Sequence, residues 1–156
     1  MEEKQPDTKA DIKPSKIRLS AMGFLAGREY LRSQLQEKLE KKFDNSPLIP
    51  DVLDQLAAEN LQSDCRFIEA FIRSRISRGQ GSTRIRLELK SRGAETSLVE
   101  QLLDQAEIDW FELAKNTAQL KFGSDHRVDA KEKAKRMRFL QYRGFSFDQI
   151  NYALNN

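Results

Sequence analysis

The sequence is poor in the residues on which most catalytic and cofactor sites depend. It has one histidine and one cysteine in 156 residues, whereas a structural zinc site takes about four such ligands. Gly79 and Gly81 stand without the further glycine and preceding strand of a phosphate-binding loop. The acidic residues do not form the spaced cluster that would bind a divalent metal. We therefore expect no enzyme, no metal and no cofactor.

Long apolar runs are also absent. No run approaches the roughly 18 residues that a transmembrane helix requires, and the N-terminus lacks the apolar stretch of a secretory signal. A single cysteine cannot form a disulfide within the chain, so nothing indicates an oxidising compartment. We expect a cytoplasmic protein without membrane contact, and a monomer, because neither a disulfide nor a metal is available to join two copies.

Charge is abundant and is arranged in blocks. Residues 66–92 carry eight basic side chains against two acids, and residues 127–143 carry seven against two, whereas residues 94–112 carry six acids and no base. Charge runs are often only solvated helix faces. Two basic blocks at corresponding places of an internal repeat nevertheless favour a binding surface.

Residues 1–16 hold four acids, four lysines and two prolines. A segment of that composition cannot offset its ordering entropy by burial, so we expect a disordered tail. From Ile17 onwards the apolar spacing is helical; in residues 63–78 five apolar side chains fall on one stripe. No stretch alternates with period two for long enough to form a strand. The sequence predicts an all-α fold.

Several short signals mark the helix ends. Ser82 is placed to cap a helix that ends at Gly93. The segments 97–100 and 146–149 have the Ser-x-x-Glu/Gln pattern of a capping box. Two prolines fit only the first turn of a helix, so a helix is expected to open between residues 46 and 51.

An internal repeat organises these helices. A shift of 50 residues places the run 53–55 on the identical run 103–105, and a shift of 51 places 92–93 on 143–144. Units this short bury their apolar faces only by stacking on neighbours, which predicts an elongated array. The expected parts are the tail at 1–16 and three-helix repeats at 17–60, 61–106 and 107–156. The nine expected helices are 17–27, 31–42, 48–60, 63–78, 81–92, 96–106, 108–122, 129–143 and 146–154.

Several segments of the chain together resemble the RecX family. They are SDCRF at 63–67, FIRSR at 71–75, GQGSTRIRLELKSRG at 79–93 and RFLQYRGFSFDQI at 138–150. REY at 28–30, followed by a leucine and a Lys-Leu pair, is similar to the family's first repeat. The resemblance extends from about Ser20 to Leu154.

The resemblance implies a fold and a function. Members of the family are small cytoplasmic bacterial regulators, built from three tandem three-helix repeats, that bind the RecA recombinase. They restrain extension of the RecA filament on single-stranded DNA and with it ATP hydrolysis, strand exchange and co-protease activity. This role regulates recombination, DNA repair and the SOS response. The implied partner is the RecA nucleoprotein filament, with weak non-specific DNA contact in addition.

The candidate partner-binding residues are the cations of the two basic blocks, because guanidinium groups bind both carboxylates and phosphates through paired hydrogen bonds. They are Arg73, Arg75, Arg78, Arg84, Arg86, Lys90 and Arg92 in the second repeat, and Lys131, Lys133, Lys135, Arg136 and Arg138 in the third. The alternative function is a module that binds DNA directly, with helices 81–92 and 96–106 as a helix-turn-helix. The acidic second helix is a poor groove reader.

Other conspicuous residues have simpler interpretations. Four arginines recur near helix ends, where a cation favours the helix dipole and can bind free carbonyls, so a structural role is expected. His126 is expected to be an ordinary solvated residue, and Cys65 a bystander. The large aromatic residues are expected in the core rather than as base-stacking platforms. The arginines are Arg28, Arg78, Arg92 and Arg143; the aromatic residues are Phe67, Phe71, Trp110, Phe111, Phe139, Phe145 and Phe147.

Overall fold

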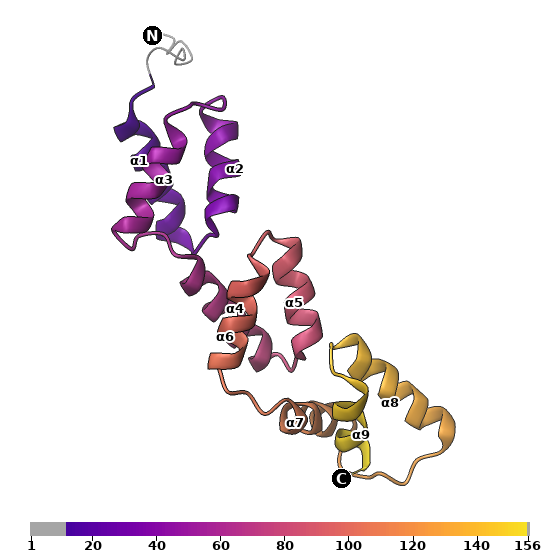
Figure 1. Ribbon diagram of the computed structural model, residues 1–156. Coiled ribbons are helices and arrows are strands. Elements are labelled where there is room, and N and C mark those ends of the chain that lie inside the picture. Colours follow the sequence, from indigo (N-terminus) through magenta and orange to yellow (C-terminus); the bar gives the residue numbers. More distant parts are fainter. Residues whose placement is uncertain (1–11, 156) are drawn as a thin grey trace. The chain divides into compact units, whose positions relative to one another are not determined.

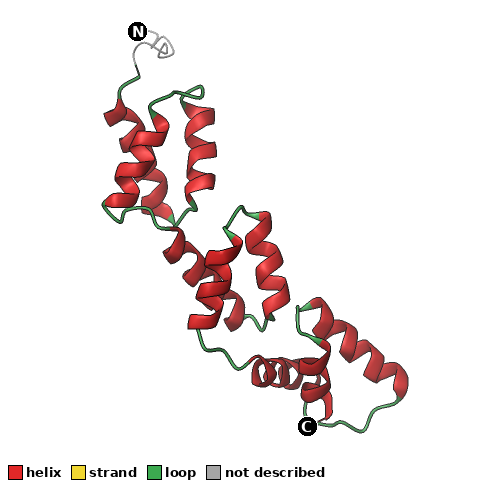
Figure 2. Cartoon of the chain, in the orientation of Figure 1, coloured by secondary structure: helices red, strands yellow, loops and turns green. Residues whose placement is uncertain are grey.

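The computed structural model describes residues 12–155, and every regular element in that range is a helix (Figure 2). The nine helices of this range begin and end within three residues of the predicted positions. They are α1 (Pro14–Gly27), α2 (Arg32–Lys42), α3 (Ile49–Ala58), α4 (Asp64–Ser77), α5 (Ser82–Ser91), α6 (Thr96–Gln105), α7 (Trp110–Phe122), α8 (Ala130–Tyr142) and α9 (Phe147–Asn155).

The chain forms two compact units, one ending at Phe67 and the other beginning at Ile68. In the first unit α1, α2 and α3 lie side by side (Figure 1) and pack pairwise. Their shared core contains Ile17 from α1, Leu35 and Leu39 from α2, and Leu53 and Leu56 from α3, all fully buried. The spacing of four within α2 and of three within α3 is the helical period that places apolar side chains on one face.

Polar residues join the end of the first unit to its second helix. The carboxylate of Asp64 accepts hydrogen bonds from the backbone N–H of Arg32 (2.8 Å) and from Nε2 of Gln62 (2.8 Å). Gln62 is buried and also donates to the carbonyl of Tyr30 (3.2 Å). One of the free N–H groups at the start of α2 therefore finds its acceptor 32 residues away in the chain.

In the second unit, α9 packs against α7 and α8 around a core that includes Ala114, Leu140 and Ala153. Side-chain carboxylates cap two of these helices. Asp109 accepts from the N–H of Glu112 at the start of α7, and Asp129 accepts from the N–H of Glu132 at the start of α8. These Asp caps were not predicted, although Asp is a favoured N-cap residue.

A close backbone approach joins α5 to the turn between α8 and α9, and we call it the 81/144 joint. The N–H of Gly81 donates to the carbonyl of Arg143 (2.8 Å), and the N–H of Thr83 donates to the carbonyl of Gly144 (3.2 Å). A Cβ atom on Gly81 would lie 2.4 Å from the Gly144 oxygen. Gly144 has φ +95°, and a Cβ there would lie 2.5 Å from Cβ of Arg84. Glycine is required at both positions.

Some predicted boundaries and caps are wrong. Helix α1 begins at Pro14, so residues 14–16 are helical rather than part of a tail; proline at the first helical position has its φ already fixed. The expected tail at 1–11 lies outside the described residues. Ser82 is the first residue of α5 and follows Gly81, which occupies the N-cap. Helix α6 begins at Thr96, so Ser97 lies inside it and donates to the Glu95 carboxylate instead of capping.

Two predicted helix starts are confirmed. Ser146 and Gln149 form the capping box before α9: the N–H of Gln149 donates to the Ser146 hydroxyl (3.3 Å), and the N–H of Ser146 donates to the Gln149 side chain (2.9 Å). Helix α3 carries Pro50 in its first turn, as the proline pattern predicted.

Candidate interaction surface

The carboxylate of Glu88 on α5 lies between two of the predicted arginines. Nε of Arg84 donates to one carboxylate oxygen (3.0 Å), and Nε of Arg75 on α4 lies 3.1 Å from the other. The second contact is an ion pair without hydrogen-bond alignment among the described residues. The side chains of Arg75, Arg84 and Glu88 are only 16%, 29% and 22% exposed. Both arginines therefore have a structural role within the second unit.

The ring of Phe71 also contacts two arginines of this repeat. The guanidinium carbon of Arg75 lies 4.5 Å from the ring centroid, and that of Arg92 lies 4.8 Å from it. Arg92 also donates to the carbonyl of Glu88 near the end of α5 (3.2 Å). The helix-end role expected of Arg92 is present, and the cation–π contacts add to it.

The acidic helix α6 neutralises part of the basic helix α5. Arg86 makes a paired contact with Glu100, with Nε–Oε1 at 2.6 Å and a second nitrogen–oxygen distance of 3.1 Å. Arg86 also donates to the Ser82 hydroxyl. The basic and acidic blocks, separate in the sequence, meet on adjacent helices.

In the third repeat Arg136 is largely enclosed and is held by internal contacts. Its side chain is 11% exposed, pairs with Glu132 (3.3 Å) and donates to the carbonyl of Asp125 (3.0 Å). Its guanidinium carbon lies 5.0 Å from the centre of the Phe122 ring. Lys133, three residues earlier on α8, makes one side-chain hydrogen bond among the described residues, to the Asn155 amide oxygen at 3.4 Å. Arg136 thus anchors α8 to the preceding loop.

Two titratable groups in this part of the chain have shifted pKa values. The backbone N–H and guanidinium of Arg127 hydrogen-bond to Asp125 and lower the pKa of its carboxyl. Tyr152 on α9 donates a short hydrogen bond to Glu112 on α7, which raises the pKa of the phenol, with burial adding to the shift. The Asp125 shift arises from hydrogen bonds within the loop after α7, whereas the Tyr152 hydrogen bond joins α9 to α7.

Six of the twelve candidates keep their charged heads in solvent. Among residues 12–155, these six side chains make no hydrogen bond, ion pair or ring contact, and all six residues are exposed. They are the part of the predicted set that is available to a partner without breaking an internal contact. They are Arg73, Arg78 and Lys90 in the second repeat, and Lys131, Lys135 and Arg138 in the third.

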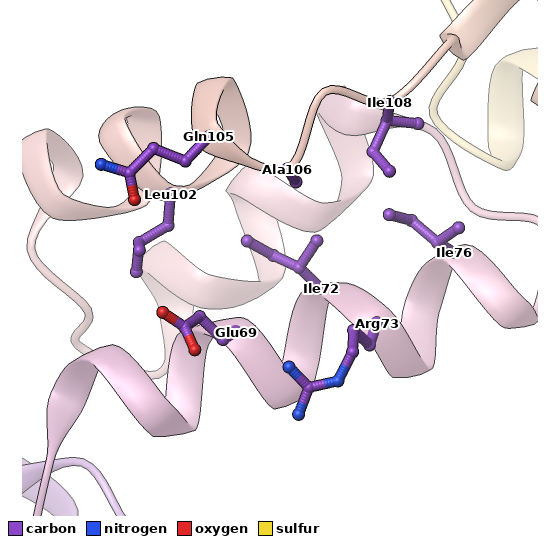
Figure 3. A pocket seen from close by; sticks show the side chains of 8 residues that line it. All are labelled: Glu69, Ile72, Arg73, Ile76, Leu102, Gln105, Ala106 and Ile108. Carbon is purple, nitrogen blue, oxygen red and sulfur yellow. The ribbon is translucent and has the colours of Figure 1, made fainter.

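Arg73 lies at the edge of a groove between α4 and α6 (Figure 3). The groove has a volume of about 410 Å³ and an apolar lining that includes Ile72, Ile76 and Leu102. Glu69, one turn before Arg73, brings the opposite charge to the same edge. Sequence periodicity places Ile72 and Ile76 on the apolar stripe of residues 63–78, but it gives no sign of a groove beside them.

Several aromatic residues are more exposed than expected. Phe145 is buried as predicted, but Phe147 is 67% exposed and Phe111 is 43% exposed. Phe147 is the first residue of α9 and projects beyond the core, while Phe111 packs edge-on against the Tyr152 ring. Tyr142, which the sequence did not single out, is 74% exposed beneath the Arg84 guanidinium, at 4.8 Å.

The remaining expectations concern metals, membranes and reactive groups. Among the described residues no group of three His, Cys, Asp or Glu side chains could hold a metal ion. No helix in that range is both long and apolar enough to cross a membrane. Cys65 is exposed near the start of α4, and His126 is exposed in the loop after α7.

Comparison with known proteins gives consistent matches. The sequence model of the second three-helix domain of RecX matches residues 63–103, and that of the third domain matches residues 107–154. Regulatory protein RecX of Chromohalobacter salexigens is 44% identical over 86% of this chain and 88% of its own length. The same-named protein of Pseudomonas putida is 42% identical over 91% of both chains, and that of Halorhodospira halophila is 38% identical over 88% and 85%.

Solved structures agree on the fold. The crystal structure of RecX from Lactobacillus salivarius has a TM-score of 0.78 at 21% identity, covering 91% of this chain and 94% of that one. A crystal structure of a regulatory protein RecX has a TM-score of 0.77 at 21% identity, covering 100% and 83%.

Proposed function

This chain belongs to the RecX family, and from that premise we propose that it is a negative modulator of the RecA recombinase. It binds the RecA filament on single-stranded DNA and inhibits filament extension, ATP hydrolysis, strand exchange and co-protease activity. In the cytoplasm it thereby regulates recombination and DNA repair. The relatives that match along most of the chain, all named regulatory protein RecX, carry this proposal.

The exposed cations support a binding role over catalysis. Six candidates leave their charged heads in solvent, whereas Arg75, Arg84, Arg86, Arg92 and Arg136 hold internal contacts. Carboxylates of a protein partner or phosphates of the bound DNA can pair with exposed cations without first breaking such a contact. We therefore propose that the six exposed cations carry most of the partner binding.

The test is the ATP hydrolysis of RecA on single-stranded DNA, with this protein titrated in. Inhibition well below one molecule per RecA subunit supports interference with filament growth. No inhibition at equal amounts contradicts the proposal.

Two triple variants that remove the same number of positive charges test whether the exposed cations of the second repeat form the binding surface. The triple variant Arg73→Gln, Arg78→Gln and Lys90→Gln removes three exposed cations. If each contributes about 0.5 kcal/mol, the half-inhibitory concentration rises by about tenfold. The control Lys13→Gln, Lys115→Gln and Lys121→Gln removes the same charge elsewhere and should inhibit like the wild type. Equal inhibition by the two variants would exclude the assigned surface.

A further inference from the structure

The first unit contains a cationic hollow that the sequence did not assign. It has a volume of about 550 Å³ and lies between the end of α1, the following turn and one side of α2. We propose that this hollow binds the phosphodiester backbone of a single nucleic-acid strand. The cationic and aromatic residues that line it are Phe24, Arg28, Tyr30, Lys38, Lys41 and Lys42.

The charges of the hollow are unbalanced. Four of its lining side chains are cationic, and Glu37 is the one acid among them. Glu37 is already paired with Lys41 at 3.4 Å, and both side chains are about three-quarters exposed. The other three cations, Arg28, Lys38 and Lys42, are exposed and form no ion pair with a described carboxylate. An anion that enters the hollow gains electrostatic energy from cations on both sides.

Aromatic rings hold these cations in place. The Arg28 guanidinium carbon lies 4.2 Å from the centre of the Tyr30 ring. Nζ of Lys38 lies 5.1 Å from the centre of the Phe24 ring, and Nζ of Lys42 lies 5.8 Å from the same centre. Cation–π contact restricts the long side chains before a ligand arrives, so less rotamer entropy is lost on binding.

The same contacts argue for phosphate rather than for bases or for an acidic peptide. Tyr30 is only 7% exposed, and cations lie near both the Tyr30 and Phe24 rings, so a base would compete with them for a ring face. A peptide ligand usually gains affinity from an apolar anchor in a pocket, and the covered rings offer none. Cations alone suffice for a phosphate backbone, and binding through them is independent of base sequence.

The helical spacing suits a strand rather than a single ion. Lys38 and Lys42 are one turn apart on α2, about 6 Å along the axis, and Arg28 lies beyond them in the preceding turn. Successive phosphates of an extended strand can therefore each meet a different cation.

The experiment measures binding of the full-length chain to a fluorescein-labelled oligothymidylate of about 20 nucleotides over a range of salt concentrations, without RecA. The measured quantity is the slope of log K against log salt concentration, where K is the association constant. The double variant Lys38→Gln, Lys42→Gln should lower the magnitude of this slope by about 1.4, because each lost phosphate contact on a single strand contributes about 0.7. The control Lys115→Gln with Lys121→Gln removes two lysines that also lie near aromatic rings, and its slope should equal that of the wild type.

Three results of the salt titration and of competition would each overturn the proposal. They are an unchanged slope in the Lys38/Lys42 variant, an equal change in the control, and competition by polyglutamate or inorganic phosphate as strong as that by oligothymidylate at equal charge. Oligoadenylate should bind as tightly as oligothymidylate, and a large preference between them would also contradict a backbone contact.

A footprint on the wild-type chain covers the case in which the variant fails to fold. Oligothymidylate should protect the amines of Lys38 and Lys42 from acetylation more than those of Lys115 and Lys121, and equal protection excludes the site. Because RecA is absent throughout, the proposal does not rest on the RecA-directed function, and the two can fail separately.

Discussion

Replacing Gly81 by alanine tests the 81/144 joint at a position where the backbone itself is unstrained. Gly81 has φ −82°, which alanine adopts freely, so backbone strain adds nothing. The loss of stability comes from the close approach and from the lower N-cap preference of alanine. The added Cβ would lie 2.4 Å from the Gly144 oxygen and 2.7 Å from the Phe145 nitrogen. Ordinary contact needs about 3.5 Å, and the turn after α8 must therefore move by about 1 Å.

That movement lengthens the two backbone hydrogen bonds of the joint, from Gly81 at 2.8 Å and from Thr83 at 3.2 Å. Loss of each costs about 1 kcal/mol or more, because the donors at the start of α5 are left without partners. The alanine restricts the unfolded chain and returns about 0.5–1 kcal/mol. The poorer N-cap offered by alanine roughly offsets this return. We therefore expect a net decrease in the free energy of unfolding of about 2 kcal/mol, measured by urea denaturation.

Gly23→Ala is the matched control. Gly23 lies inside α1, and an added Cβ there meets no atom within 4 Å. Alanine is about 1 kcal/mol better than glycine in a helix interior, so this variant should be stabilised. If Gly81→Ala is as stable as the wild type, the two backbones do not approach closely enough to exclude a Cβ atom at position 81.

Two further predictions concern individual polar side chains. Asp64→Ala leaves the Arg32 N–H and the Gln62 amide without their acceptor and should lower the free energy of unfolding by about 1–3 kcal/mol in a thermal melt. Asp54→Ala, which removes an exposed ion pair to the same arginine, should cost less than about 1 kcal/mol; equal losses would contradict the role of Asp64. Because the pKa of Tyr152 is raised in the folded state, its protonated phenol stabilises the fold at pH values below 10.0, the ordinary pKa of tyrosine. This contribution is lost as the pH rises through the pKa of the folded state. Glu112→Gln should therefore lower the pKa of Tyr152 in an ultraviolet titration, with Tyr152→Phe identifying its band, and an unchanged pKa would contradict the assignment.

The helices were predictable because their signals are local. The apolar stripe of residues 63–78 predicts α4, and the Ser146–Gln149 pair predicts the start of α9; both depend on residues within a few turns. The N-cap at Gly81 was not predictable, since that glycine is there for contact with Gly144, 63 positions away. The residue at the N-cap of α5 is therefore set by this tertiary contact and not by the preference of serine for N-cap positions.

The candidate site was harder to predict than the fold. A count of charges finds the basic block at 66–92 but cannot distinguish Arg86, paired with Glu100, from the exposed Lys90. The cationic hollow was missed for a related reason. Lys38 and Lys42 belong to no basic block, and α1 and the following turn bring Phe24 and Arg28 to them only after folding.

The 81/144 joint has a consequence for truncation experiments. A chain cut at residue 106, intended to remove the third repeat and retain the second, would also remove the acceptors of the Gly81 and Thr83 N–H groups. It would likewise remove the Tyr142 ring beneath the Arg84 guanidinium. Loss of activity in such a fragment would report damage at the start of α5 as much as the absence of the third repeat. The contributions of the second and third repeats to activity are therefore better separated by point substitutions at exposed cations than by deletions.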